Sequence, residues 1–174
     1  MPVRYPIMAV LVTALIVFLV VAAFRAWRSR ANAQEAQFGA PLEWLEHPSG
    51  GRQWTGIQYV ATSVQGSPLE RVNAHGLGLR GFGKITVSQD GILIERNGER
   101  AIGIPAAQLS AVSRTSVAID RSVEKDGLIQ IDWQQDGFAL STYLRATSNE
   151  TRKQLFEELT QILGGKNNKE TSND

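Results

Sequence analysis

Near its start the chain contains PIMAVLVTALIVFLVVAAF (residues 6–24), nineteen residues without a charged side chain. As a helix this stretch would be about 28 Å long, close to the ~30 Å hydrocarbon thickness of a bilayer. Twelve of its residues are Leu, Ile, Val or Phe, and at roughly −0.3 to −0.6 kcal/mol each they favour insertion by about 4–7 kcal/mol. A helix packed on a soluble core would show a polar stripe, and this stretch has none. We therefore predict a transmembrane helix over residues 6–24.

Basic and aromatic residues flank the predicted span: Arg4, Tyr5, Arg25, Trp27, Arg28 and Arg30. Aromatic rings favour the membrane–water interface, and arginine-rich flanks stay in the cytoplasm. Three arginines follow the span, against Arg4 and the α-amine before it. The pattern predicts a single-pass plasma-membrane protein with its N-terminus outside and its C-terminal domain in the cytoplasm.

A cleaved signal peptide is the alternative, because Ala31-Asn32-Ala33 has the small-x-small form of a cleavage site. This tripeptide lies seven residues beyond the span and behind three arginines, and the apolar run is longer than a usual signal sequence. The chain has no cysteine, which rules out both a lipid-modified cysteine and a disulfide framework. We expect the helix to be retained.

The rest of the chain is about one domain in length and slightly acidic. Four of the 18 basic residues lie in residues 1–30, so residues 31–174 carry 14 basic and 17 acidic side chains, a net charge of −3. This balance argues against nonspecific binding of nucleic acid. We divide the chain into a short tail (1–5), the span (6–24), a basic juxtamembrane segment and linker (25–51), a domain (52–164) and a disordered tail (165–174). Three apolar linker residues, Leu42, Trp44 and Leu45, are expected to pack on the domain, with the headgroup layer as the alternative.

Short β-type runs separated by turns fill the domain. The turns contain Asp90-Gly91, Asn97-Gly98, Asp126-Gly127 and Asp136-Gly137, which are typical of tight β-turns. The expected strands are residues 57–62, 85–87, 92–94, 99–104, 117–119, 128–133 and 138–144. About seven strands at this spacing predict an antiparallel sandwich or barrel.

One amphipathic helix is predicted to close the domain. Thr147 and Glu150 have the spacing of a capping box. Apolar residues follow at helical spacing: Leu155, Phe156, Leu159, Ile162 and Leu163. Gly164 is the expected end of the helix, and the open end of a small β-barrel is the surface that this helix would cover.

The order of these elements resembles the pleckstrin-homology-like (PH-like) architecture: seven strands in an antiparallel sandwich or barrel, capped by a C-terminal helix. The chain is also similar to small actinobacterial membrane proteins with one N-terminal span and a PH-like domain. The residues that carry the likeness are YVAT (59–62), LERV (69–72), AHGLG (74–78), IPAAQLSAV (104–112) and GLI (127–129) leading to Trp133. The resemblance implies a fold and a location, and no reaction.

A glycine-rich stretch, GLGLRG (76–81), matches the G-x-G-x-x-G pattern of nucleotide-binding loops. Those loops open a helix, whereas a strand is expected here at residues 85–87, so we expect the glycines to serve a tight crossing between strands. Basic residues surround this stretch: Arg71, His75, Arg80 and Lys84. They are candidates for facing anionic lipid headgroups. The alternative is that the arginines are ordinary solvated residues, paired with Glu70 or Glu95.

Catalytic patterns are absent from the sequence. His47 and His75 are isolated, no G-x-S-x-G motif occurs, and no His or Cys spacing indicates zinc. We predict no enzyme activity, no cofactor and no metal. The sequence favours a membrane-anchored binding module for an unidentified protein partner. The alternatives are recognition of anionic lipid headgroups, or a role as accessory subunit of a membrane transporter or envelope complex.

Overall fold

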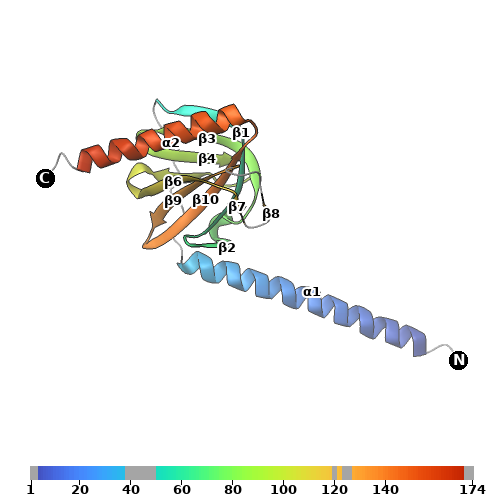
Figure 1. Ribbon diagram of the computed structural model, residues 1–174. Coiled ribbons are helices and arrows are strands. Elements are labelled where there is room, and N and C mark those ends of the chain that lie inside the picture. Colours follow the sequence, from blue (N-terminus) through green and yellow to red (C-terminus); the bar gives the residue numbers. More distant parts are fainter. Residues whose placement is uncertain (1–3, 38–49, 119–120, 123–126, 171–174) are drawn as a thin grey trace.

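The computed structural model describes residues 4–37, 50–118, 121–122 and 127–170. Its first element is one long helix, α1 (Arg4–Gln37), which projects from the β domain (Figure 1). The helix contains the predicted span and continues past the arginines to Gln37. Leu42, Trp44 and Leu45 lie outside the described residues.

The domain is built on an eight-stranded antiparallel sheet. Seven of its strands follow the order β5-β4-β3-β1-β10-β9-β6, and β2 pairs with β1. Two further strands, β7 and β8, form a separate pair. The strands are β1 (Arg52–Val64), β2 (Ser67–Arg71), β3 (Gly81–Ser88), β4 (Gly91–Arg96), β5 (Ile102–Pro105), β6 (Leu109–Thr115), β7 (Val117–Ala118), β8 (Arg121–Ser122), β9 (Leu128–Gln135) and β10 (Phe138–Ala146). Short 3₁₀ turns, η1 (Ala74–Gly76) and η2 (Ala106–Gln108), interrupt two of the connections.

Alternation along the strands selects the side chains of the core. In β9, Ile129, Ile131 and Trp133 are fully buried in the main cluster, while Gln134 beside them is exposed. The strands also approach closely at Gly83, where a Cβ would collide with the backbone carbonyl of Glu95. The sheet thus closes over its core because apolar residues recur every second position and a glycine allows β3 to meet β4.

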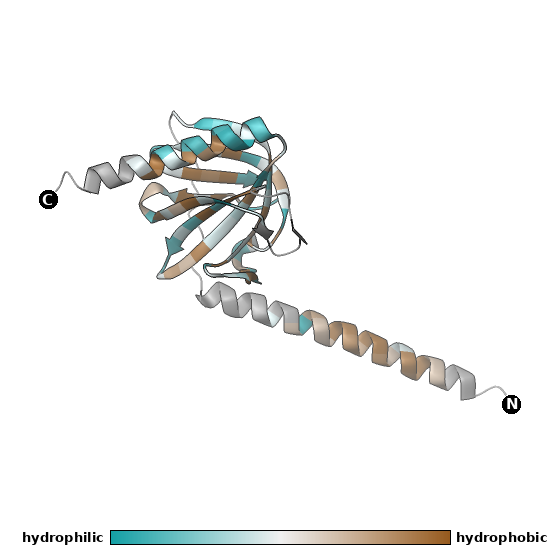
Figure 2. Cartoon of the chain, viewed as in Figure 1, coloured by the Kyte–Doolittle hydropathy of each residue, from teal (hydrophilic) through white to brown (hydrophobic). Residues whose placement is uncertain are grey.

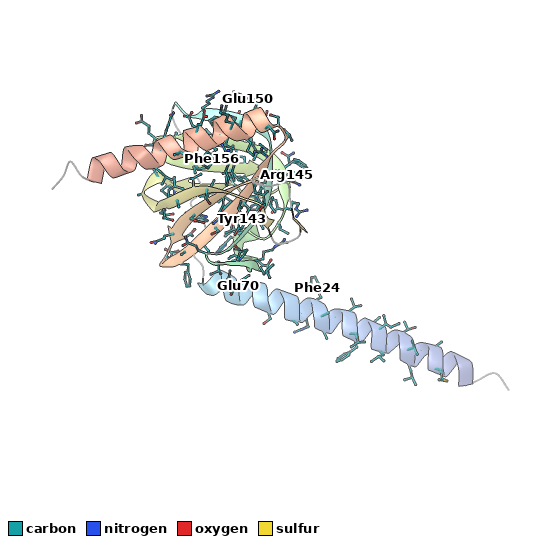
Figure 3. The ribbon with its side chains drawn as sticks, viewed as in Figure 1. Phe24, Glu70, Tyr143, Arg145, Glu150 and Phe156 are labelled. Atoms are coloured by element: carbon teal, nitrogen blue, oxygen red, sulfur yellow. The ribbon has the colours of Figure 1, made fainter. Side chains whose placement is uncertain are left out.

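The second helix, α2 (Asn149–Glu170), covers the core. It lies against β6, β10, η2 and β3. Leu155 and Leu159 are fully buried beneath it. Figure 3 shows Phe156 turned towards the sheet and Glu150 turned away, and Figure 2 shows the same division between apolar and polar faces. Arg114 of β6 places its guanidinium 4.4 Å from the Phe156 ring centre.

The sequence predicted both ends of α2 at the wrong residues. Its cap is Ser148, whose Oγ accepts a hydrogen bond from the Thr151 backbone N–H at 3.0 Å; Thr147, the predicted cap, lies one residue too early. The helix also runs through Gly164 to Glu170, because a glycine inside a helix costs only about 1 kcal/mol. Residues 165–170 are therefore helical, and residues 171–174 lie outside the described part of the chain.

The predicted fold class is confirmed: the domain is a mainly β, PH-like antiparallel sheet with a C-terminal helix, preceded by an apolar helix. Three strands were not expected, namely β2, β6 and β8. The strand predicted at 117–119 is the two-residue β7 in the described residues.

We predict that Ser148→Ala lowers the free energy of unfolding by about 1 kcal/mol, because it removes the N-cap hydrogen bond of α2. Thr147→Ala is the matched control and should cost clearly less. Urea denaturation of both variants in detergent, followed by circular dichroism, measures the difference. Equal losses would contradict the assignment of the cap.

Candidate functional site in the connection between β2 and β3

The glycine-rich stretch forms the connection between β2 and β3. It turns through η1, where His75 and Gly76 both have left-handed backbone angles (φ 51° and 73°). A Cβ at Gly78 would collide with the Asn73 side chain and lie 3.1 Å from the Val72 carbonyl oxygen. The glycines therefore permit a tight crossing, as the sequence led us to expect. α1 lies beside η1, so this connection is also where the domain meets the long helix.

Four consecutive backbone carbonyls of this connection, at residues 76–79, accept hydrogen bonds from within the domain. Arg96 Nη1 donates to the oxygens of Gly76 at 2.7 Å and Leu79 at 3.0 Å. The Leu77 oxygen accepts from the Tyr59 hydroxyl at 2.6 Å and from the Thr62 N–H at 3.0 Å. Arg71 Nη1 donates to the Gly78 oxygen at 3.3 Å. The backbone of residues 76–79 is thus held by groups of the domain.

We call these hydrogen bonds to the carbonyls of residues 76–79 the clamp. A buried chain of hydroxyl groups supports the clamp. Tyr59 Oη lies 2.7 Å from Thr62 Oγ1, which lies 2.7 Å from Thr142 Oγ1, and the Trp133 Nε1–H donates to Thr142 Oγ1 at 3.0 Å. A carbonyl only accepts, so Tyr59 gives its single proton to Leu77. Thr62 must then donate to Tyr59, and Thr142 to Thr62. All donors therefore point one way, from Trp133 towards the connection.

Arg96, which sequence reasoning missed, is the main residue of the clamp. Its side chain is 4% exposed, its guanidinium lies 4.6 Å from the Tyr59 ring centre, and Nη2 donates to the Arg100 oxygen at 3.1 Å. A signal was present: Ile92, Ile94 and Arg96 alternate along one strand, which places the arginine on the inner face. Carbonyl acceptors and an aromatic face compensate the buried charge there.

The predicted basic residues fall into two environments. Arg71, His75 and Arg80 belong to the β2–β3 connection or its edge, and Arg80 is exposed. Lys84 lies inside β3, where its Nζ is 3.1 Å from Glu95 Oε2 on the neighbouring strand. Glu95 was an expected partner of the arginines, not of Lys84. The structure thus gathers three of the four residues along one connection and gives the fourth an acidic partner.

The six predicted anchor flanks, Arg4, Tyr5, Arg25, Trp27, Arg28 and Arg30, all lie on α1. An apolar window of this helix, Met8–Ala26, is long enough to cross a membrane. Within the described residues, no group of three or more histidines and carboxylates comes together as a metal site. His47 lies outside them.

Burial raises the pKa of the Tyr59 phenol, because the phenolate would be poorly solvated; Thr62, Arg96 and Arg71 oppose this shift. The phenol therefore stays protonated in the folded protein when free tyrosine, with its pKa of 10.0, already ionises. It keeps its role as a donor to Leu77 over the whole physiological range.

We predict that Tyr59→Phe destabilises the domain by about 1–3 kcal/mol, because it removes the donor to Leu77 and leaves the Thr62 hydroxyl without its acceptor. Tyr143→Phe is the matched control, since Tyr143 is equally buried and its hydroxyl accepts one longer bond from Ser63 at 3.3 Å. Urea denaturation of the full chain in detergent measures both variants.

The same pair tests the raised pKa. Above pH 10 the unfolded chain loses the Tyr59 proton and the folded chain keeps it, so unfolding becomes easier as pH rises. The stability advantage of the wild type over Tyr59→Phe should therefore shrink above pH 10, by about 1.4 kcal/mol per pH unit. An advantage that stays constant to pH 11 would contradict the buried, protonated phenol.

One of three comparisons with known proteins identifies the family of the domain. The sequence model of the family described as "Bacterial PH domain-like" matches residues 46–160. No curated protein matches the chain. Among solved structures, a chain of "The 8S snRNP Assembly Intermediate" superposes with a TM-score of 0.49 and 14% sequence identity, over 70% of this chain and 89% of that chain.

Proposed function

The chain belongs to the bacterial PH domain-like family, and from this premise we propose that it is a membrane-anchored, non-enzymatic binding module. It presents its PH-like domain at the plasma membrane to a protein partner. PH-like domains are typically binding modules without catalytic activity.

One observation carries the membrane part of this proposal. The large apolar side chains of Met8–Ala26 are 48–67% exposed, and Figure 2 shows this part of α1 as a continuous, mainly hydrophobic stretch. The domain meanwhile has a complete core of its own. Lipid is the partner that can cover such a helix. Its one hydroxyl in this band is compatible with lipid, since Thr13 Oγ1 donates to the Ala9 oxygen at 2.9 Å.

The positive-inside rule supports the orientation of the anchor. Arg25, Arg28 and Arg30 follow the span, so the domain that comes after them lies in the cytoplasm and the N-terminus outside. The likeness to small actinobacterial single-span proteins points to the same arrangement.

The edge of the sheet supports a protein partner. β6 ends the strand order and pairs only with β9 among the described strands. Ser110 on this strand is exposed, and Ala111 to Ser113 are half-buried. An antiparallel edge strand can accept an extended peptide as one more strand, here along the part of β6 that α2 leaves accessible. A peptide partner is favoured over lipid headgroups, because two of the basic side chains already have partners in the protein: Lys84 pairs with Glu95, and Arg71 donates to the Gly78 oxygen.

We predict that the chain stays in the membrane pellet after alkaline carbonate washing. Replacing Leu15 and Val17 with arginine should release it, because each arginine at the centre of a span costs about 2.5–3.5 kcal/mol and together they cancel the gain from the apolar residues. The control is Leu15→Ile with Val17→Ile. A fluorescent protein fused to the C-terminus should be active in the cytoplasm. Release of the wild-type chain would contradict the anchor.

We predict that a photoreactive amino acid at Ser110, in the full chain in its native membrane, crosslinks to a cytoplasmic protein that mass spectrometry identifies. The same group at Gln89, exposed in the turn between β3 and β4, is the control and should not capture it. An integral membrane protein captured through α1 would instead favour an accessory subunit of a transporter or envelope complex. Crosslinks to lipid alone would favour headgroup recognition.

A further inference from the structure

The exposed large apolar side chains of the domain gather in one segment. In the described residues outside α1 they are Leu69, Leu79 and Phe82, which are 79%, 48% and 55% exposed. All three lie between the start of β2 and Phe82, the second residue of β3. This is the segment whose η1 turn lies beside α1. The domain therefore shows its exposed apolar groups where its own anchor arrives.

The distance to the bilayer is short. After Ala26, the end of the apolar window, α1 continues for eleven residues to Gln37, or about 16 Å of helix. The interfacial layer on each side of the hydrocarbon is itself several ångströms thick. The connection lies beside this end of α1 (Figure 1), and because about 16 Å exceeds the interfacial layer, docking requires α1 to tilt from the bilayer normal towards the domain.

Several backbone groups of this connection already have hydrogen-bond partners in the protein, so they tolerate a medium poor in water. An unsatisfied carbonyl is costly to move out of water. The carbonyls of residues 76–79 all accept hydrogen bonds from inside the domain. The Leu77 and Leu79 N–H groups donate to the Ala74 and Gly76 oxygens. Side chains at the tip can therefore enter the interface without stripping water from these backbone groups.

We propose that the β2–β3 connection is a second membrane contact, which docks Leu79 and Phe82 into the interface of the bilayer that holds α1. The contact is apolar, with Arg80 beside it at headgroup level, and it fixes the orientation of the domain. This inference rests on the anchor described under Proposed function. It differs from headgroup recognition by charge, because it requires no anionic lipid.

The test uses the full chain in vesicles of zwitterionic phosphatidylcholine. The chain has no cysteine, so Leu79→Cys and Phe82→Cys each carry a single environment-sensitive fluorophore. Both should show blue-shifted emission and quenching by nitroxide lipids. Lys153→Cys, exposed on α2, should show neither. Ala26→Cys, at the end of the apolar window, reports insertion of the anchor independently.

A second variant tests the side chains themselves. With the fluorophore at Arg80→Cys, replacing Leu79 and Phe82 with serine should abolish most of the quenching, while thermal unfolding stays nearly unchanged because both side chains are exposed. Molar salt should leave the wild-type signal intact, since it screens charge and not apolar contact.

Three results would overturn the inference. If labels at 79 and 82 emit as in water while Ala26→Cys is quenched, the anchor stands and the second contact fails. If Ala26→Cys is not quenched either, the anchor itself fails. If docking needs anionic phosphatidylglycerol and disappears in salt, the contact is one of charge.

Discussion

The clamp on the β2–β3 connection is the interaction on which the rest of this structure depends. Arg96 and Tyr59 hold the carbonyls of a segment that forms no regular structure, and the hydroxyls of Thr62 and Thr142 link that clamp to the far strands of the sheet. Directed hydrogen bonds of this kind cost little when complete and much when broken. The connection is therefore one conformation held by the core.

The domain and α1 differ in whether their apolar side chains are buried or exposed. The domain buries its apolar residues in a core that includes Trp133 and Leu159. The described large apolar side chains of α1, from Met8 to Phe24, are exposed, and the proposed lipid environment would cover them. If the proposed anchor holds the domain at the membrane, the domain does not need high affinity for the surface, because the anchor supplies the local concentration. Weak contacts near the anchor then decide which face the domain shows to a partner.

Sequence periodicity predicted most of the fold and little of the clamp. Alternation and turn residues located β3, β4, β9 and β10, because burial on one face leaves a pattern along the chain. The strand β6 was missed because its polar residues blur that pattern. The N-cap of α2 was assigned to Thr147 instead of Ser148, since either hydroxyl oxygen can accept the capping hydrogen bond. Arg96 was missed because an arginine usually marks a surface, and only its partners show why it is buried.

The hydrogen bonds also explain why the glycine pattern does not make an anion site. A phosphate loop offers free N–H groups to its ligand. Here the Leu77 and Leu79 N–H groups already donate to the Ala74 and Gly76 carbonyls. The Arg96 and Arg71 guanidinium groups also donate to backbone carbonyls of this connection. Of the basic side chains singled out in the sequence, Arg71 thus serves the connection itself and Lys84 pairs with Glu95. At the surface of the connection Leu79 is exposed beside Arg80, so an apolar contact there binds by solvent exclusion.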